Sequence, residues 1–364
     1  MLVRPPAQRW TDPAGFILAA LGSALGIDAL ATVPYLALAH GGGAFLLAYL
    51  ILVAGAVLPL MILEIGVGVC FQASAPGGLR RLNRHLQWIG WWTTVLALVV
   101  GILVAIQGAQ GLILGGNAIL ALVGDVAGGW DDPLPEGAWW WERGPEAGHL
   151  LPASGILLAL IVLWLVAARI LIRGMPEIGR WCTVFIPLNL ALLVGIGVAF
   201  LYQPGAVDGV ARYLVPHWSA LLELDTWTAA ARAAFLTQAM GLGVYIAYAS
   251  HLERGSDSAG HALLISLAGA GFTFLAGFVG CAAMGMLAVA EGRPILEGVA
   301  EGPRAALDLL TQAVDILPLP AWGSAIMGTL LAALWVLLAL TSVLGLMAAV
   351  IVACTDAFPL SWER

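Results

Sequence analysis

The chain has 364 residues, of which 61% are hydrophobic and 10% are charged, and its formal net charge is −7. Its mean hydropathy is +0.95. Soluble domains carry about 25% charged residues, so this composition argues against a soluble enzyme, a disordered chain and a disulfide scaffold. The negative charge argues against a nucleic-acid partner. The composition predicts an all-α integral membrane protein with many helices.

Long apolar runs without Asp, Glu or Arg divide the chain. A helix needs roughly 20 apolar residues to cross a membrane. The runs predict eight transmembrane helices, near residues 14–38, 43–69, 88–122, 152–172, 182–203, 227–249, 260–289 and 322–354. We expect one transmembrane domain over residues 1–357, an acidic, Trp-rich extracytoplasmic loop at 124–150 and a cytoplasmic tail at 358–364.

The arginines lie in alternate loops, at residues 4–9, 80–84, 169–180 and 254, whereas the loop at 124–150 is acidic. Loops rich in Lys and Arg stay on the cytoplasmic side of a membrane. We therefore predict a multi-pass protein of the cell inner (plasma) membrane, with both termini in the cytoplasm.

Two of the predicted helices contain residues that interrupt a membrane helix. The first has Gly22, Gly26, Asp28 and Pro34 within its apolar run, and the sixth has two glycines, at 241 and 243. Glycine-interrupted spans in corresponding positions point to a transporter binding site, although glycine also serves close helix packing. Broken helices would free backbone polar groups that line a cavity.

Several motifs, in order from about residue 10 to 357, resemble the neurotransmitter:sodium symporter family. They are Gly15–Gly26, Pro34–Tyr35, His40–Phe45 (HGGGAF), Leu58–Glu64, Gly241–Ser250, Leu275–Phe278 and Leu340–Ser342. The resemblance implies a LeuT-type fold, an inverted-repeat bundle in which broken helices 1 and 6 meet. This chain ends after its eighth helix and has Thr32 at the outer-gate Arg position, so we expect a natural short form whose second repeat is incomplete.

The resemblance implies a sodium site between helices 1 and 8. It would use three backbone carbonyls and two hydroxyls, those of Gly22, Leu25, Leu338, Thr341 and Ser342. The alternative is that both hydroxyls only bond to carbonyls four residues earlier, as is common in membrane helices. The family's other sodium site is not matched, because Ala29 and Gly269 stand at its two Asn positions.

The resemblance also implies a solute pocket, lined by Ala24, Asp28, Val104, Leu236, Gln238, Ala239 and Leu242. Val104 stands at the position of the tyrosine that grips a substrate carboxylate, so we expect a cationic or neutral solute rather than a zwitterionic amino acid. Asp28 replaces a glycine, and an ionisable group inside a span is a functional candidate. It could bind a substrate ammonium, serve an ion site or carry a proton; the alternative is that it only caps freed helix amides.

Two further sets of residues carry roles that the resemblance implies. Glu64 would hold the broken sixth helix, whose interruption contains Gly241 and Gly243. Trp10 and Asp356 would form an inner gate, with Arg9 in place of the family's Arg at position 7, which is Ala in this chain. A surface ion pair without a gating role is the alternative, worth about 1 kcal/mol or less.

Together these features predict a secondary active transporter in a lipid bilayer. It would perform sodium-coupled symport of a small organic solute (amino-acid-like, amine or neutral) by alternating access, with H⁺ taken up through Asp28 as a variant. One alternative is a degenerate, non-transporting family member that acts as a receptor or assembly subunit. Another is that the chain is half of a complex and needs a partner, either a second copy in a homodimer or another membrane chain. We expect no enzyme activity and no metal other than Na⁺, because no nucleophile–base pair or metal cluster was found.

Overall fold

The computed structural model describes residues 9–127, 151–297 and 302–358. Within these ranges every regular element is a helix, and the β-type pairing is an isolated bridge between Gly42 and Pro216. The predicted loop at 124–150 and tail at 358–364 fall almost wholly outside the described residues. The all-α prediction is confirmed.

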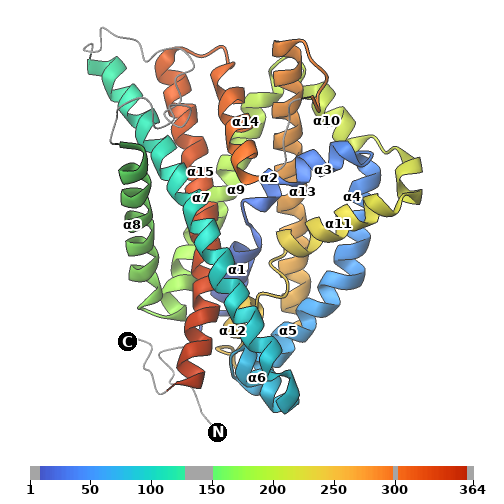
Figure 1. The fold of residues 1–364 in the computed structure, drawn as a ribbon, viewed down its shortest axis with the longest axis vertical. Helices are drawn as coiled ribbons and strands as arrows, with labels where there is room; N and C mark the ends of the chain where they lie inside the picture. The colour runs from blue at the N-terminus through green and yellow to red at the C-terminus, as the bar shows by residue number, and fades with distance from the viewer. Residues whose placement is uncertain (1–8, 128–150, 298–301, 359–364) are drawn as a thin grey trace.

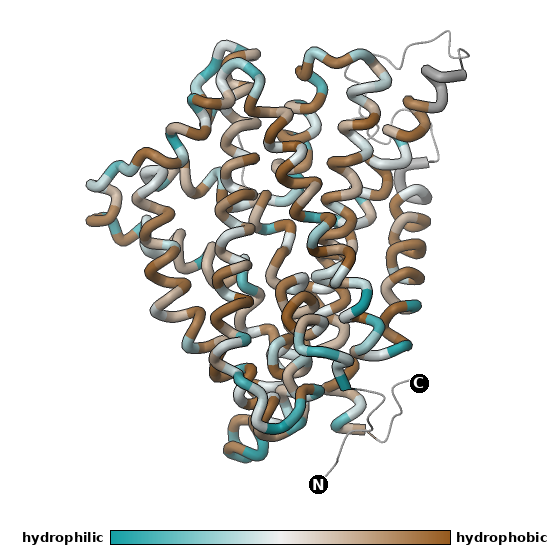
Figure 2. The backbone as a smooth tube through the Cα atoms, turned by 180° about the vertical axis from the view of Figure 1, so that it is seen from behind, coloured by the Kyte–Doolittle hydropathy of each residue, from teal (hydrophilic) through white to brown (hydrophobic). Residues whose placement is uncertain are grey.

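Six helical segments of the described chain are long and apolar enough to cross a membrane. They are Pro13–Ala31, Gly43–Phe71, Arg84–Leu122, Met175–Leu201, Ser258–Glu291 and Ala321–Ala357, and Gly155–Leu171 is a shorter apolar helix. Figure 2 shows hydrophobic residues along the middle of the molecule and hydrophilic residues gathered toward its two ends. The protein is therefore a multi-pass membrane protein, while the count of eight helices stays a prediction.

The first predicted helix, 14–38, is divided into three pieces: α1 (Pro13–Ala24), α2 (Asp28–Ala31) and α3 (Val33–Ala39). Asp12 caps α1, since its Oδ1 accepts from the amide of Gly15 at 2.5 Å. The next helix runs as α4 (Gly43–Leu52), a π-helical turn (Val53–Val57) and α5 (Leu58–Phe71).

The turn between α3 and α4 depends on its three glycines. Gly41 and Gly42 have φ of 85° and 60°, which L side chains rarely adopt. A Cβ at Gly42 would overlap the carbonyl oxygen of Arg212, and one at Gly43 would overlap that of Leu214. The turn therefore packs backbone to backbone against the end of α10 (Ala206–Leu214).

The middle of the chain forms α6 (Ala75–Leu82), a 3₁₀ turn (Arg84–Leu86), α7 (Gln87–Ala127), α8 (Leu151–Leu171) and α9 (Met175–Leu201). Helix α9 begins at Met175 and not near 182, because Glu177 in its first turn suits a helix N-terminus. Glu177 also pairs with Arg173 at 3.2 Å.

The last part contains α10, a 3₁₀ turn (Trp218–Leu222), α11 (Leu224–Thr237), α12 (Val244–Ala249), α13 (Ser258–Glu291), α14 (Pro303–Asp315) and α15 (Ala321–Ala357). The predicted helix at 227–249 is thus α11, a non-helical link and α12. Figure 1 shows α10 and α14 at the upper end of the molecule and α6 at the lower end.

Helices α7 and α15 lie against each other in Figure 1 and are joined through small residues. Cβ atoms at Gly108 and Gly111 would lie 2.8 Å from Ala339 and 3.0 Å from Trp335. Small residues let membrane helices approach closely. Helix α15 is therefore held on one side by α7, while its other contacts include α1, α9 and α12.

Candidate ion and solute site

The link between α1 and α2 leaves two backbone carbonyls outside the helical hydrogen-bond ladder. In a continuous helix the amide of Gly26 would donate to Gly22, and that of Ala29 to Leu25. Instead, Gly26 donates to the carbonyl of Ala24 at 2.8 Å, and Ala29 donates to that of Gly26 at 3.2 Å. The carbonyls of Gly22 and Leu25 are two of the predicted sodium ligands.

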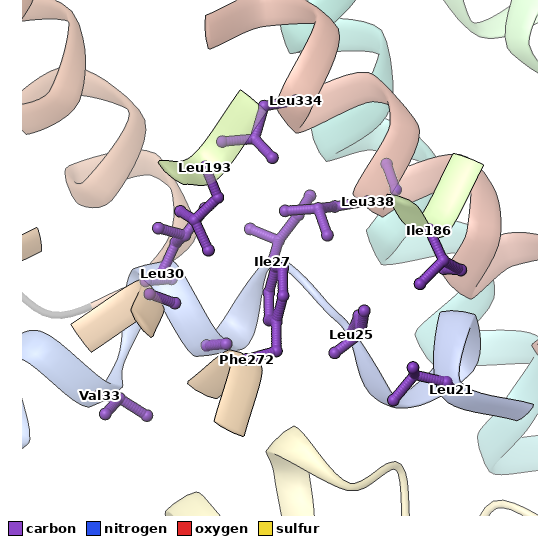
Figure 3. Close-up of a cluster of buried hydrophobic side chains, with 14 of the residues drawn as sticks. Leu21, Leu25, Ile27, Leu30, Val33, Ile186, Leu193, Phe272, Leu334 and Leu338 are labelled. Carbon is purple, nitrogen blue, oxygen red and sulfur yellow. The ribbon is translucent and has the colours of Figure 1, made fainter. Parts of the chain in front are cut away.

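The same link lies against α15. A Cβ at Gly22 would be 3.1 Å from the Cβ of Thr341, and one at Gly26 would be 3.8 Å from the Oγ of Ser342. Figure 3 shows Leu25 on this link and Leu338 on α15. The structure therefore places the α1–α2 link against Thr341 and Ser342, two of the five predicted ion-site residues, and the ion site stays a prediction.

The two hydroxyls of the predicted ion site differ in their hydrogen bonds. Thr341 Oγ1 donates to the carbonyls of Leu337 at 3.0 Å and Leu338 at 3.1 Å, which is the back-bonding of the alternative interpretation. Ser342 Oγ is buried and has no hydrogen-bond partner among the described residues. A buried hydroxyl left unpaired costs about 1–3 kcal/mol.

This donor set fits a hard cation such as Na⁺. It consists of neutral carbonyl and hydroxyl oxygens, which suit hard cations better than nitrogen or sulfur ligands do. The orphan hydroxyl of Ser342 and the two released carbonyls are the oxygens that a cation would satisfy. Thr341 keeps lone pairs for a cation even while its proton is donated.

Asp28 opens α2 and is half-buried. Its carboxylate makes no hydrogen bond or ion pair with any residue that the structure describes, so it does not cap the freed amides. Asp28 Oδ2 and Ser342 Oγ lie 3.6 Å and 3.8 Å from the same point, the place a Cβ on Gly26 would occupy. The one acid of this link is therefore a neighbour of the predicted ion site.

The link between α11 and α12 is held by the predicted glutamate. Glu64 Oε1 accepts from the amide of Gly241 at 3.1 Å, and Oε2 is buried without a partner. Ala239, Gly241 and Gly243 have φ of 47°, 77° and 70°. Left-handed residues cannot continue a right-handed helix, so the chain must leave the helix here.

The predicted pocket residues do not all face one place. The amide of Gln238 is fully buried against α13 (Nε2 to Ser266 O, 3.3 Å), in the space that a side chain at Gly269 would need. Leu236 is 48% exposed on α11. Ala24 is the last residue of α1, and Ala239 is buried in the link between α11 and α12. Val104 and Leu242 are half-buried. Sequence alone could not show that Gln238 turns toward the glycine at 269.

At the lower end, two of the predicted gate residues, Trp10 and Asp356, each take part in a hydrogen bond. Trp10 Nε1 donates to the carbonyl of Tyr248 at 2.8 Å, and the two rings meet edge to face at 5.2 Å. Asp356 accepts from the amide of Ser74 at 2.6 Å. No ion pair of Arg9 is seen among the described residues, so its part in an inner gate with Asp356 stays a prediction; Ala7 lies outside the described ranges.

The comparison with protein families decides the family to which the chain belongs. The model described as the sodium:neurotransmitter symporter family matches residues 7–112 and 148–364. The chain belongs to this family. That membership confirms the resemblance drawn from the motifs, and with it the function class of sodium-coupled symport for the family.

Curated relatives agree with the family assignment. An uncharacterized sodium-dependent transporter of Methanocaldococcus jannaschii is 29% identical over 363 residues, covering 98% of this chain and 71% of that protein. The sodium- and chloride-dependent creatine transporter 1 of Bos taurus is 25% identical, covering 89% and 56%. The corresponding taurine transporter of Rattus norvegicus is 25% identical, covering 88% and 56%. These relatives are transporters, and the chain spans little more than half of the latter two.

A solved structure shows the same fold. The crystal structure of MhsT in complex with L-phenylalanine superposes with a TM-score of 0.76 at 24% identity, covering 98% of this chain and 76% of that one. The likeness supports the arrangement of helices around the two links.

Proposed function

We propose that this chain is a sodium-coupled symporter of a small organic solute that works by alternating access. The observation that carries this proposal is the release of the Gly22 and Leu25 carbonyls opposite the buried, unpartnered hydroxyl of Ser342. Family membership supports the same function. The site needs no acid to assemble, because its oxygens are neutral.

The ion site would be divided between two helices. Gly22 and Leu25 belong to the end of α1, whereas Thr341 and Ser342 sit within the continuous helix α15. A bound Na⁺ would supply the positive charge that pairs with oxygens from both helices. Any movement of α1 away from α15 would therefore separate the donor set, which links ion affinity to conformation.

The unpaired carboxylate of Asp28 would select the solute. An ionised Asp28 repels a substrate carboxylate by several kcal/mol at a low effective dielectric constant. A cationic or neutral solute would therefore be preferred, and its pocket would lie between the two links near Ala24, Asp28 and Ala239. Proton uptake by Asp28 is the variant of this mechanism.

We also propose the full predicted topology, with α1–α3 and α11–α12 each counted as one interrupted membrane helix of an inverted-repeat bundle. This gives eight membrane helices and places both termini in the cytoplasm, in the plasma membrane. Helix α6 and the turn between α8 and α9 lie at the same end in Figure 1 and both carry arginines, which supports a cytoplasmic lower end.

Uptake by proteoliposomes tests the proposal. The purified chain is reconstituted, and radiolabelled cationic, neutral and zwitterionic solutes are offered under an inward NaCl gradient or with choline chloride. We expect sodium-driven uptake of a cationic or neutral solute, lost in Asp28→Asn for a cationic one and kept in the matched control Asp208→Asn, an exposed acid on α10. Uptake driven only by a pH gradient would favour the proton variant. No uptake of any solute under either gradient would contradict transport.

A further inference from the structure

A buried asparagine on α9 has no partner for either end of its carboxamide. Asn189 is 0% exposed, and its Oδ1 and Nδ2 make no hydrogen bond with any described residue. It lies within the longest apolar part of α9, next to Pro187. Buried side-chain amides are nearly always hydrogen-bonded in native proteins, so this residue requires an explanation.

The helical spacing directs Asn189 to the link between α1 and α2. Residues 186, 189 and 193 share one helix face, since side chains three and four apart lie above one another. Ile186 Cδ1 would be 3.1 Å from a Cβ at Gly22. Figure 3 shows Ile186 and Leu193 on the two sides of Ile27, within the link. Asn189 stands between them on α9 and therefore faces the same link.

Several other polar groups around the α1–α2 link also lack hydrogen-bond partners among the described residues. Ser342 Oγ has no partner, and the carbonyls of Gly22 and Leu25 are outside the helical ladder. These groups are acceptors or hydroxyls, and Asn189 adds an unpaired carbonyl-type oxygen, Oδ1, beside its unpaired amide nitrogen, Nδ2. A cluster of unpaired oxygens in an apolar interior is what a hard cation requires.

We propose that Asn189 is a further ligand of the cation site between α1 and α15, through its carboxamide Oδ1. With Asn189 as a ligand, α9 becomes the third helix that holds the site. This inference rests on the proposed sodium site. It adds a side chain that lies on a different helix and that family resemblance did not indicate.

Thermal unfolding of the detergent-purified chain over a titration of NaCl, at constant ionic strength with choline chloride, tests this inference. Asn189→Leu removes the carboxamide at similar volume, and Asn189→Ala is the second variant in case leucine disturbs packing. The matched control is Thr226→Val on α11, which removes a polar group that is likewise fully buried and has no partner among the described residues, the Thr226 hydroxyl. We expect both Asn189 variants to raise the sodium dissociation constant, fitted from the dependence of stability on NaCl concentration, at least tenfold, and Thr226→Val to leave it unchanged.

The outcomes separate this inference from the proposed function. A sodium response in the unmodified chain, retained within twofold in both Asn189 variants, would overturn the role of Asn189 and leave the sodium site standing. The absence of any sodium response in the unmodified chain would overturn the sodium site itself. A general loss of stability lowers the melting temperature at every NaCl concentration and leaves the fitted dissociation constant unchanged, so it does not imitate the expected result.

Discussion

Replacing Ser342 by alanine should lower the stability of the protein in sodium chloride but not in choline chloride. Ser342 is 4% exposed, and its hydroxyl has no hydrogen-bond partner in the part of the chain that the structure describes. Without sodium, its removal relieves a desolvation cost of about 1–3 kcal/mol, partly offset by the small cavity left behind. We therefore expect the free energy of unfolding in choline chloride to stay equal or rise by up to about 1 kcal/mol.

In sodium the same substitution should destabilise. A ligand at 100 times its dissociation constant adds about 2.7 kcal/mol to the free energy of unfolding. If the loss of one oxygen weakens binding 100-fold, the same sodium concentration equals the new dissociation constant and adds only about 0.4 kcal/mol. We therefore expect Ser342→Ala to lower the free energy of unfolding by about 2 kcal/mol in NaCl and not to lower it in choline chloride.

Thermal unfolding in the two salts at equal ionic strength measures both effects. Thr329→Ala is the matched control, because Thr329 is on the same helix, its hydroxyl bonds to Ala325 O at 2.8 Å, and it lies three turns away from the site. It should lower stability equally in both salts. An equal loss for Ser342→Ala in both salts would refute the assignment of its hydroxyl to a cation site.

Four other substitutions, at three positions, test the links and the glycine turn; those at Ala239 and Glu64 are compared by the melting temperature of the detergent-purified chain. Ala239→Gly should raise stability by about 1 kcal/mol, because it removes a left-handed Cβ at φ 47°; a lowered melting temperature would contradict the link geometry. Glu64→Ala should cost about 1–3 kcal/mol by leaving the Gly241 amide unpaired, whereas Glu64→Gln keeps an acceptor and should cost less; equal losses would refute this role. Gly42→Ala should abolish a monodisperse gel-filtration peak, since its Cβ would overlap the Arg212 carbonyl, and a normal peak would show that the turn can shift.

The sequence predicts those features that depend on local chemistry. Apolar runs mark the long helices, and the glycines, Asp28 and Pro34 mark an interruption that falls between Ala24 and Asp28. The pairing of Glu64 with Gly241 followed from family resemblance and is present at 3.1 Å.

Features that depend on tertiary contacts could not be predicted. Helix α14 is short and amphipathic, so its sequence does not resemble a membrane span, and only its packing against α2 and α13 makes it part of the core. The direction of the Gln238 amide depends on the space beside Gly269. Asn189 gave only a weak signal, one polar residue in an apolar run, and its meaning appears when α9 is packed against the α1–α2 link.

Equilibrium binding of ²²Na⁺ to the detergent-purified chain tests the sodium site most directly. We predict saturable binding that unlabelled NaCl competes and choline chloride does not, lost in Ser342→Ala and kept in Thr329→Ala. Binding that does not saturate, or that is unchanged in Ser342→Ala, would contradict a cation site between α1 and α15.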